Sequence, residues 1–205
     1  MRYLELKQQL NNYIVFTLND IRKIEADFDK RRLNEWQNKG YIKNIRRGFY
    51  IFSDLNLNEM VLFLIANKIY YPSYISFEMA LSYYNLIPES VYGITSTSSK
   101  KTASFDTSIG YFDYHKLKPS LMFGYKLIEH QGQNFKIAEI EKVLLDYFYI
   151  NSHKKTAADF KEMRFNLEVL RNNIDRNKLN KYLQAFNNKN LDKRIKNFLA
   201  YVDVR

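Results

Sequence analysis

One cluster of charged residues has the side-chain types of a metal-dependent nuclease. Glu139, Glu141, Lys142 and Asp146 follow one another closely in the chain. Such nucleases hold their metal ions with carboxylates, commonly beside a Glu-x-Lys or Asp-x-Lys element on a strand. Here Ile140 stands two residues before Lys142, so that element is absent. The spacing instead predicts helix capping and ion pairing within one helix.

Other kinds of catalytic or metal chemistry find little support in the sequence. The chain has no cysteine, which removes disulfides, thiolate nucleophiles and cysteine-based metal sites. His115, His130 and His153 are isolated and lack the i, i+4 pairing of a metal site. The six glycines form no phosphate-cradling loop. We therefore expect no catalytic residue, metal or cofactor, and a protein that is not an enzyme.

The charge distribution favours a polyanionic partner. The 205-residue chain has a formal net charge of +10. Residues 1–55 and 151–205 are basic, whereas residues 56–150 are close to neutral. Basic domains bind nucleic acids because neutralised phosphates release their condensed counterions. The alternative is an ordinary solvated basic surface.

The basic N-terminal segment has the pattern of a winged helix-turn-helix. Apolar spacing predicts a first helix with a stripe that starts at Leu4, and Thr17 is a good N-cap for a second. A third helix is expected from about Asp29 to Lys39, ending at Gly40. Two β-rich runs, 41–45 and 49–52, flank a short turn and predict a hairpin.

The third helix and the hairpin supply the candidate DNA-binding residues. Leu33 and Trp36 set the buried side of the helix, which leaves arginine and asparagine on the opposite side. Arginine can pair bidentately with guanine, and asparagine with adenine. The hairpin adds cations for phosphates or the minor groove. The candidate residues are Lys30, Arg31, Arg32, Asn34, Asn38, Lys39, Lys43, Arg46 and Arg47.

The remainder of the chain predicts an α+β domain with a helical C-terminal tail. Asn58 and Ser76 are expected to cap two helices. Strand candidates follow at 92–97, 103–105, 109–114 and 125–128, and residues 98–101 have the composition of a hairpin turn between the first two. A helix is expected at 139–149, and residues 151–205 predict further helices with basic outer faces. The expected domains are 1–54 and 55–205.

Two motifs in this second part resemble a known family. Residues 71–88, YPSYISFEMALSYYNLIP, followed by ITST and Lys100-Lys101, are similar to AbiEi-type antitoxins, which are also transcriptional regulators. Residues 138–146, AEIEKVLLD, resemble a later element of that family, with Val143 in place of the usual alanine. The resemblance covers most of the chain up to about residue 150.

The resemblance implies an antitoxin of a type IV toxin–antitoxin system, a kind of bacterial phage-defence system. Such a protein represses its own operon by binding double-stranded DNA at promoter repeats through the winged helix. Its second domain counters a nucleotidyltransferase-like toxin without needing a stable complex. A stand-alone winged-helix regulator with a sensory or protein-interaction second domain is the alternative. The longest apolar run is too short to span a bilayer, so we expect a cytoplasmic protein without a membrane partner.

Overall fold

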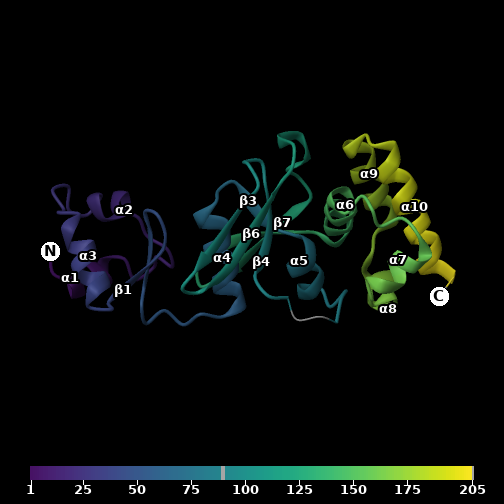
Figure 1. Cartoon of the computed structure of the whole chain (residues 1–205). Helices are drawn as coiled ribbons and strands as arrows, with labels where there is room; N and C mark the ends of the chain where they lie inside the picture. The colour runs from purple at the N-terminus through teal and green to yellow at the C-terminus, as the bar shows by residue number, and fades with distance from the viewer. Residues whose placement is uncertain (89–90, 205) are drawn as a thin grey trace.

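The computed structural model describes residues 1–88 and 91–204, which form three parts in a row. A small N-terminal unit is followed by a central sheet with two helices and then by a group of C-terminal helices (Figure 1). The fold is therefore mixed α+β, as the sequence predicts. Within the described residues, no helix is long and apolar enough to cross a membrane.

Three short helices and a hairpin make up the N-terminal unit. The helices are α1 (Tyr3–Gln9), α2 (Leu18–Arg22) and α3 (Arg31–Asn38), and the hairpin pairs β1 (Ile42–Arg46) with β2 (Phe49–Phe52) in antiparallel fashion. Thr17 is the N-cap of α2 as predicted, and it forms a capping box with Asp20. Gly40 has a φ of 72°, which suits the turn that leads from α3 into β1.

The N-terminal unit has its own core. Phe16, Phe28 and Trp36 are buried in it, and the backbone of Phe16 pairs with that of Tyr50 through two hydrogen bonds of 2.9 Å. The predicted position of Leu4 in this core is wrong, because its side chain is 74% exposed. Helix α1 ends at Gln9, so its short buried face consists mainly of Leu6, and the apolar stripe does not extend back to Leu4.

A six-stranded mixed sheet forms the central part. Its strand order is β5-β6-β4-β3-β8-β7. The strands are β3 (Ser73–Ile75), β4 (Ile94–Ser98), β5 (Ala103–Thr107), β6 (Gly110–Lys116), β7 (Tyr125–His130) and β8 (Gln133–Ala138). Helices α4 (Glu59–Ile69) and α5 (Phe77–Tyr83) pack beside it, and the 3-10 helix η1 (Pro119–Leu121) precedes β7.

The sheet corrects one predicted connection and adds two strands. Residues 98–101 do not form a hairpin turn, because β4 pairs with β6 in parallel and with β3 in antiparallel fashion. The hairpins instead join β5 to β6 and β7 to β8. Strands β3 (Ser73–Ile75) and β8 (Gln133–Ala138) were not predicted. All three residues of β3 are buried and show no alternation.

Five helices form the C-terminal part. They are α6 (Ile140–Ile150), α7 (Ala157–Glu162), α8 (Leu167–Asn173), α9 (Arg176–Phe186) and α10 (Lys189–Val204). Asp175 caps α9, because its carboxylate accepts hydrogen bonds from the amides of Asn177 and Lys178. Their apolar faces join the core of the central sheet, as Phe148 of α6 does with Phe198 of α10 at 4.9 Å between ring centroids.

Candidate nucleic-acid interface

Helix α3 is held by its buried side and by its first turn. Leu33 and Trp36 are buried, as predicted from the sequence. The Phe28 ring packs 5.5 Å from that of Trp36. At the start of the helix, the Asp29 carboxylate accepts a 2.9 Å hydrogen bond from the Arg31 amide. This bond satisfies one of the amides that a helix leaves free at its first turn.

The opposite side of α3 brings most of the predicted residues together on one exposed polar face. Asn34 and Asn38 are exposed there one turn apart. The Arg31 side chain is 91% exposed and lies 3.1 Å from Asp29, and Lys39 lies 3.9 Å from Glu35. Both pairs are solvated, so they contribute little to stability and leave the cations free to exchange partners. We call Lys30, Arg31, Asn34, Asn38 and Lys39 the α3 face.

Arg32 lies beside this face rather than on it. Its side chain is half-buried, and the guanidinium carbon lies 5.8 Å and 5.4 Å from the ring centroids of Phe28 and Trp36. A cation over an aromatic ring is favoured by the quadrupole of that ring. Arg32 therefore supports the helix from its flank.

Arg46 does not lie where we expected a DNA contact. Its guanidinium donates a hydrogen bond to the carbonyl of Ile69 at the end of α4 and covers the rings of Tyr70 and Phe105. A register shift in the hairpin between Asn44 and Arg46 interrupts the alternation of β1. The side chain of Arg46 consequently contacts the central part.

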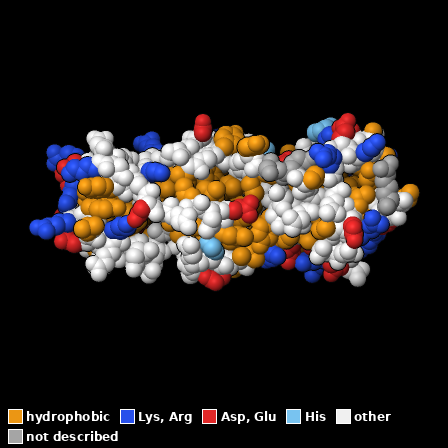
Figure 2. Space-filling view, turned by 90° about the horizontal axis from the view of Figure 1, so that it is seen from below, with side chains coloured by type: hydrophobic (Ala, Val, Ile, Leu, Met, Phe, Trp, Pro, Cys, Tyr) orange, Lys and Arg blue, Asp and Glu red, His pale blue; other side chains and the backbone are white. Residues whose placement is uncertain are grey.

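The other two predicted hairpin cations stay in solvent. Lys43 on β1 and Arg47 in the turn are both exposed. Strand β1, which leads into this turn, contacts strand β5 of the central sheet. In Figure 2, most of the blue cationic side chains lie toward the two ends of the visible face, whereas the middle shows mainly white and orange atoms. This arrangement matches the basic ends and near-neutral centre of the sequence.

A second polar group lies fully buried between the sheet and α6. Lys142 and Asp146 form an ion pair on α6 with no exposed side-chain surface. The hydroxyls of Tyr74 and Ser76 each donate a 2.9 Å hydrogen bond to Asp146, and the Lys142 ammonium lies 2.7 Å from the Tyr74 hydroxyl. Ser76 begins α5 as expected, but its side chain binds Asp146 and makes no capping bond.

Burial dominates the electrostatics of this polar centre. It raises the pKa of Asp146 and lowers the pKa of Lys142, because desolvation penalises the charged forms, while the ion pair opposes both shifts. The rings of Phe123, Phe186 and Tyr74 surround the ammonium at about 5 Å. The predicted pairing of Lys142 and Asp146 is thus confirmed, although neither side chain reaches solvent where a substrate could meet it.

The remaining charged residues of α6 connect it to α9. Glu139 accepts a 2.6 Å hydrogen bond from the Tyr182 hydroxyl and lies 2.8 Å from Lys178, while Glu141 accepts a 2.8 Å bond from the Asp175 amide. The prediction of capping and pairing within one helix is therefore wrong for these two acids, because both pair with the segment that forms α9 and Glu139 makes no side-chain capping bond. Among the described residues, no group of three or more His, Asp or Glu side chains could hold a metal ion.

Comparisons with known proteins add no further constraint on the site. No protein-family model matches the chain, and no curated protein matches it closely enough to count as a relative.

Proposed function

We propose that this chain is an AbiEi-type antitoxin that binds its own promoter through an N-terminal winged helix-turn-helix and represses its operon. The α3 face carries the proposal, because it combines an arginine and two asparagines with flanking lysines on a helix whose other side is fixed in a core. These are side chains that read base edges and bind phosphates in the major groove.

The order of elements supports α3 as the recognition helix. Three helices precede a hairpin, and the segment before α2 pairs with β2 through Phe16 and Tyr50. This pairing links the hairpin to the helices, so that both would meet DNA as one unit. The motifs at residues 71–88 and 138–146 support the antitoxin role of the rest of the chain by resemblance alone.

Binding to the promoter upstream of the chain's own gene tests the DNA-binding half. Fluorescence anisotropy with promoter and random duplexes, over a series of salt concentrations, should show tighter binding to the promoter and an inverse salt dependence. The variant Arg31→Ala/Asn34→Ala should lose the preference for the promoter. Lys116→Ala removes one exposed cation of the central sheet and serves as control. Equal affinity of the wild-type chain for both duplexes would refute promoter recognition.

Co-expression tests the antitoxin half. The product of the adjacent gene should arrest growth when expressed alone, and co-expression of the full-length chain should restore growth. The Arg31→Ala/Asn34→Ala variant, expressed from an unrelated promoter, should restore growth equally well. Arrest that persists in the presence of the soluble full-length chain would refute the antitoxin role.

A stand-alone regulator with a sensory second domain is supported by a different observation. A cavity of about 390 Å³ lies between the N-terminal unit and the central sheet. Ile14 and Val15 line it from one side, and Lys68, Ser73 and Lys136 line it from the other. The Ser73 hydroxyl is buried without a hydrogen-bond partner among the described residues. A ligand there would contact both the DNA-binding unit and the sheet.

The two functions differ in what changes promoter binding. A sensory regulator would bind its promoter with an affinity that depends on a small molecule, and Lys136→Gln would reduce that dependence. An antitoxin needs no such molecule, and its neighbouring gene encodes the toxin. An adjacent gene product without toxicity would therefore favour the regulator.

A further inference from the structure

A polar cavity of about 530 Å³ lies between the segment that follows α6 and one side of α10. Three cationic and three neutral polar side chains line it, and its described lining contains no carboxylate. These residues are Ser152, Lys155, Asn190, Lys193, Arg194 and Asn197. We call this site the α10 cavity. It is separate from the α3 face, since the two occur at opposite ends of the molecule (Figure 1).

The sequence of α10 places four of these residues together. Asn190, Lys193, Arg194 and Asn197 are spaced at intervals of three and four, so they share one side of a helix with 3.6 residues per turn. The adjoining side carries the buried residues Leu191, Ile195 and Phe198. Packing of this apolar side against α6 therefore fixes which way the polar side faces.

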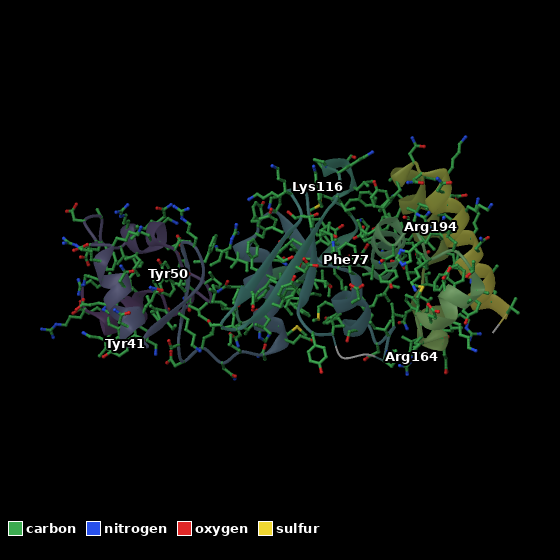
Figure 3. All side chains as sticks on the ribbon, viewed as in Figure 1. Tyr41, Tyr50, Phe77, Lys116, Arg164 and Arg194 are labelled. Carbon is green, nitrogen blue, oxygen red and sulfur yellow. The ribbon has the colours of Figure 1, made fainter. Side chains whose placement is uncertain are left out.

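Arg194 is a buried cation without an acidic partner. Only 7% of the residue is exposed, and its Nη2 donates a 3.0 Å hydrogen bond to the carbonyl of Phe148 on α6. Its Nε–H is buried without a partner, and no carboxylate pairs with the guanidinium among the residues that the structure describes. Figure 3 shows Arg194 among the C-terminal helices. Because a guanidinium stays protonated, this charge is held inside the protein uncompensated.

Several other cations of the same helices are paired with acids, whereas Lys181 and Lys189 are exposed and have no ion-pair partner among the described residues. Lys196 lies 2.8 Å from Asp192, Lys178 lies 2.8 Å from Glu139, and Arg176 binds Asp203. In contrast, neither Lys155 nor Lys193 has an ion-pair partner among the described residues. The positive charge of the α10 cavity is therefore concentrated where the protein supplies no counter-charge.

We propose that the α10 cavity binds the terminal phosphate of a small phosphorylated molecule such as a nucleoside monophosphate. Arginine presents a planar set of donors that matches phosphate oxygens, and the two lysines add point charges. The amides of Asn190 and Asn197 and the Ser152 hydroxyl supply neutral donors. A terminal phosphate presents three free oxygens and reaches a recessed arginine more readily than a phosphate within a duplex. This proposal is independent of promoter binding at the α3 face.

A purely structural role for Arg194 accounts for only part of these observations. A cation near the last turn of α6 is favoured by the helix dipole, and the bond to Phe148 belongs to that role. It does not account for two unpaired lysines beside the same cavity. Lys155 and Lys193 therefore distinguish phosphate binding from a structural role, because they are exposed and can be replaced without disturbing the core.

Isothermal titration calorimetry with inorganic phosphate and with AMP, at an ionic strength held constant with chloride, tests the proposal on the full chain. Both ligands should bind, and each of Lys155→Gln and Lys193→Gln should weaken binding by about tenfold, as expected for loss of a charge-assisted hydrogen bond. Lys181→Gln removes an exposed lysine of α9 that does not line the cavity and should leave the affinity unchanged. Arg194→Gln should abolish binding in a chain that retains its helical circular dichroism.

Three outcomes would overturn the proposal. One is the absence of binding of either ligand at millimolar concentration. Another is an equal loss of affinity in Lys181→Gln, which would indicate diffuse attraction to the basic surface. The third is that Lys155→Gln and Lys193→Gln lose binding to random duplexes but keep their affinity for AMP. That result would show that the cavity binds DNA instead of a small phosphorylated molecule. Arg31→Ala/Asn34→Ala should leave AMP binding intact even where promoter binding fails.

Discussion

The guanidinium carbon of Arg46 lies 4.2 Å from the centre of the Phe105 ring, so a residue of the hairpin rests on strand β5 of the central sheet. The same side chain binds the carbonyl of Ile69. These contacts connect the unit that we propose reads DNA to the domain that we propose neutralises a toxin. Arg46 thus joins the two parts of the protein, whereas the sequence pattern predicts that it contacts DNA.

Arg46→Met should destabilise the full chain and only weakly affect binding to DNA. The variant loses the hydrogen bond to Ile69 and the contact with Phe105, which together should cost about 1–3 kcal/mol of unfolding free energy. Urea denaturation would measure this cost. Arg47→Met is the matched control, because its side chain is exposed in the same turn, and it should change stability by less than about 0.5 kcal/mol. Equal stability of the two variants would refute the joining role of Arg46.

Arg47 should show the opposite pattern in DNA binding. If it contacts a phosphate, Arg47→Ala should weaken binding to promoter and random duplexes alike and reduce the slope of log affinity against log salt by about one. Arg31→Ala should instead cost about 1–3 kcal/mol on the promoter and less on random DNA. Anisotropy titrations at several salt concentrations separate the two. An unchanged slope for Arg47→Ala would exclude the hairpin turn from the interface.

Lys142→Met should be strongly destabilising because it leaves Asp146 buried without its cation. Loss of one partner of a buried ion pair typically costs about 3–5 kcal/mol. The double variant Lys142→Met/Asp146→Asn should recover part of that loss, as a double-mutant cycle by chemical denaturation would show. Lys196→Met breaks the solvated i, i+4 pair with Asp192 and should cost less than about 0.5 kcal/mol. Additive effects in the cycle would contradict coupling between Lys142 and Asp146.

Acid should selectively weaken the start of helix α7. Hydrogen bonds from the amides of Lys155 and Thr156 lower the pKa of Asp159 to about 2. Since this folded-state pKa lies below the unfolded value, the contribution of Asp159 is complete above about pH 4 and is lost as the pH falls through 2. The stability difference between wild type and Asp159→Ala should therefore shrink across that range. A difference that stays constant from pH 6 to pH 2 would contradict this assignment.

Local chemistry made several elements predictable from the sequence. The capping box of Thr17 and Asp20, the cap at Asp175 and the buried side of α3 each depend on residues within one or two turns. The positions of β4 to β7 were also anticipated to within a few residues. The pairing of these strands was not predictable. Strand β4 pairs with β3 in antiparallel and with β6 in parallel fashion, and no turn residue in the sequence indicates such a pairing.

The site was less predictable than the helices that carry it. The exposure of Arg31, Asn34 and Asn38 follows from helical periodicity, but the direction of Arg46 depends on a register shift within β1. The pairing of Lys142 with Asp146 follows from i, i+4 spacing, whereas their complete burial depends on a sheet and on α9. The α10 cavity needs Ser152 and Lys155 to lie beside α10, which is a tertiary contact that spacing cannot reveal.

The separate N-terminal core has a consequence for how the protein is made. All the buried residues of that core lie between Leu6 and Phe52, whereas strand β3, in the middle of the sheet, pairs with β8 some sixty residues later in the chain. Contacts between near neighbours form faster than distant ones, and domains of a nascent chain tend to fold from the N-terminus. We therefore expect the helix-and-hairpin unit to be folded while the ribosome is still translating the sheet. A chain stalled in mid-synthesis would then carry the α3 face before it carries a finished second domain.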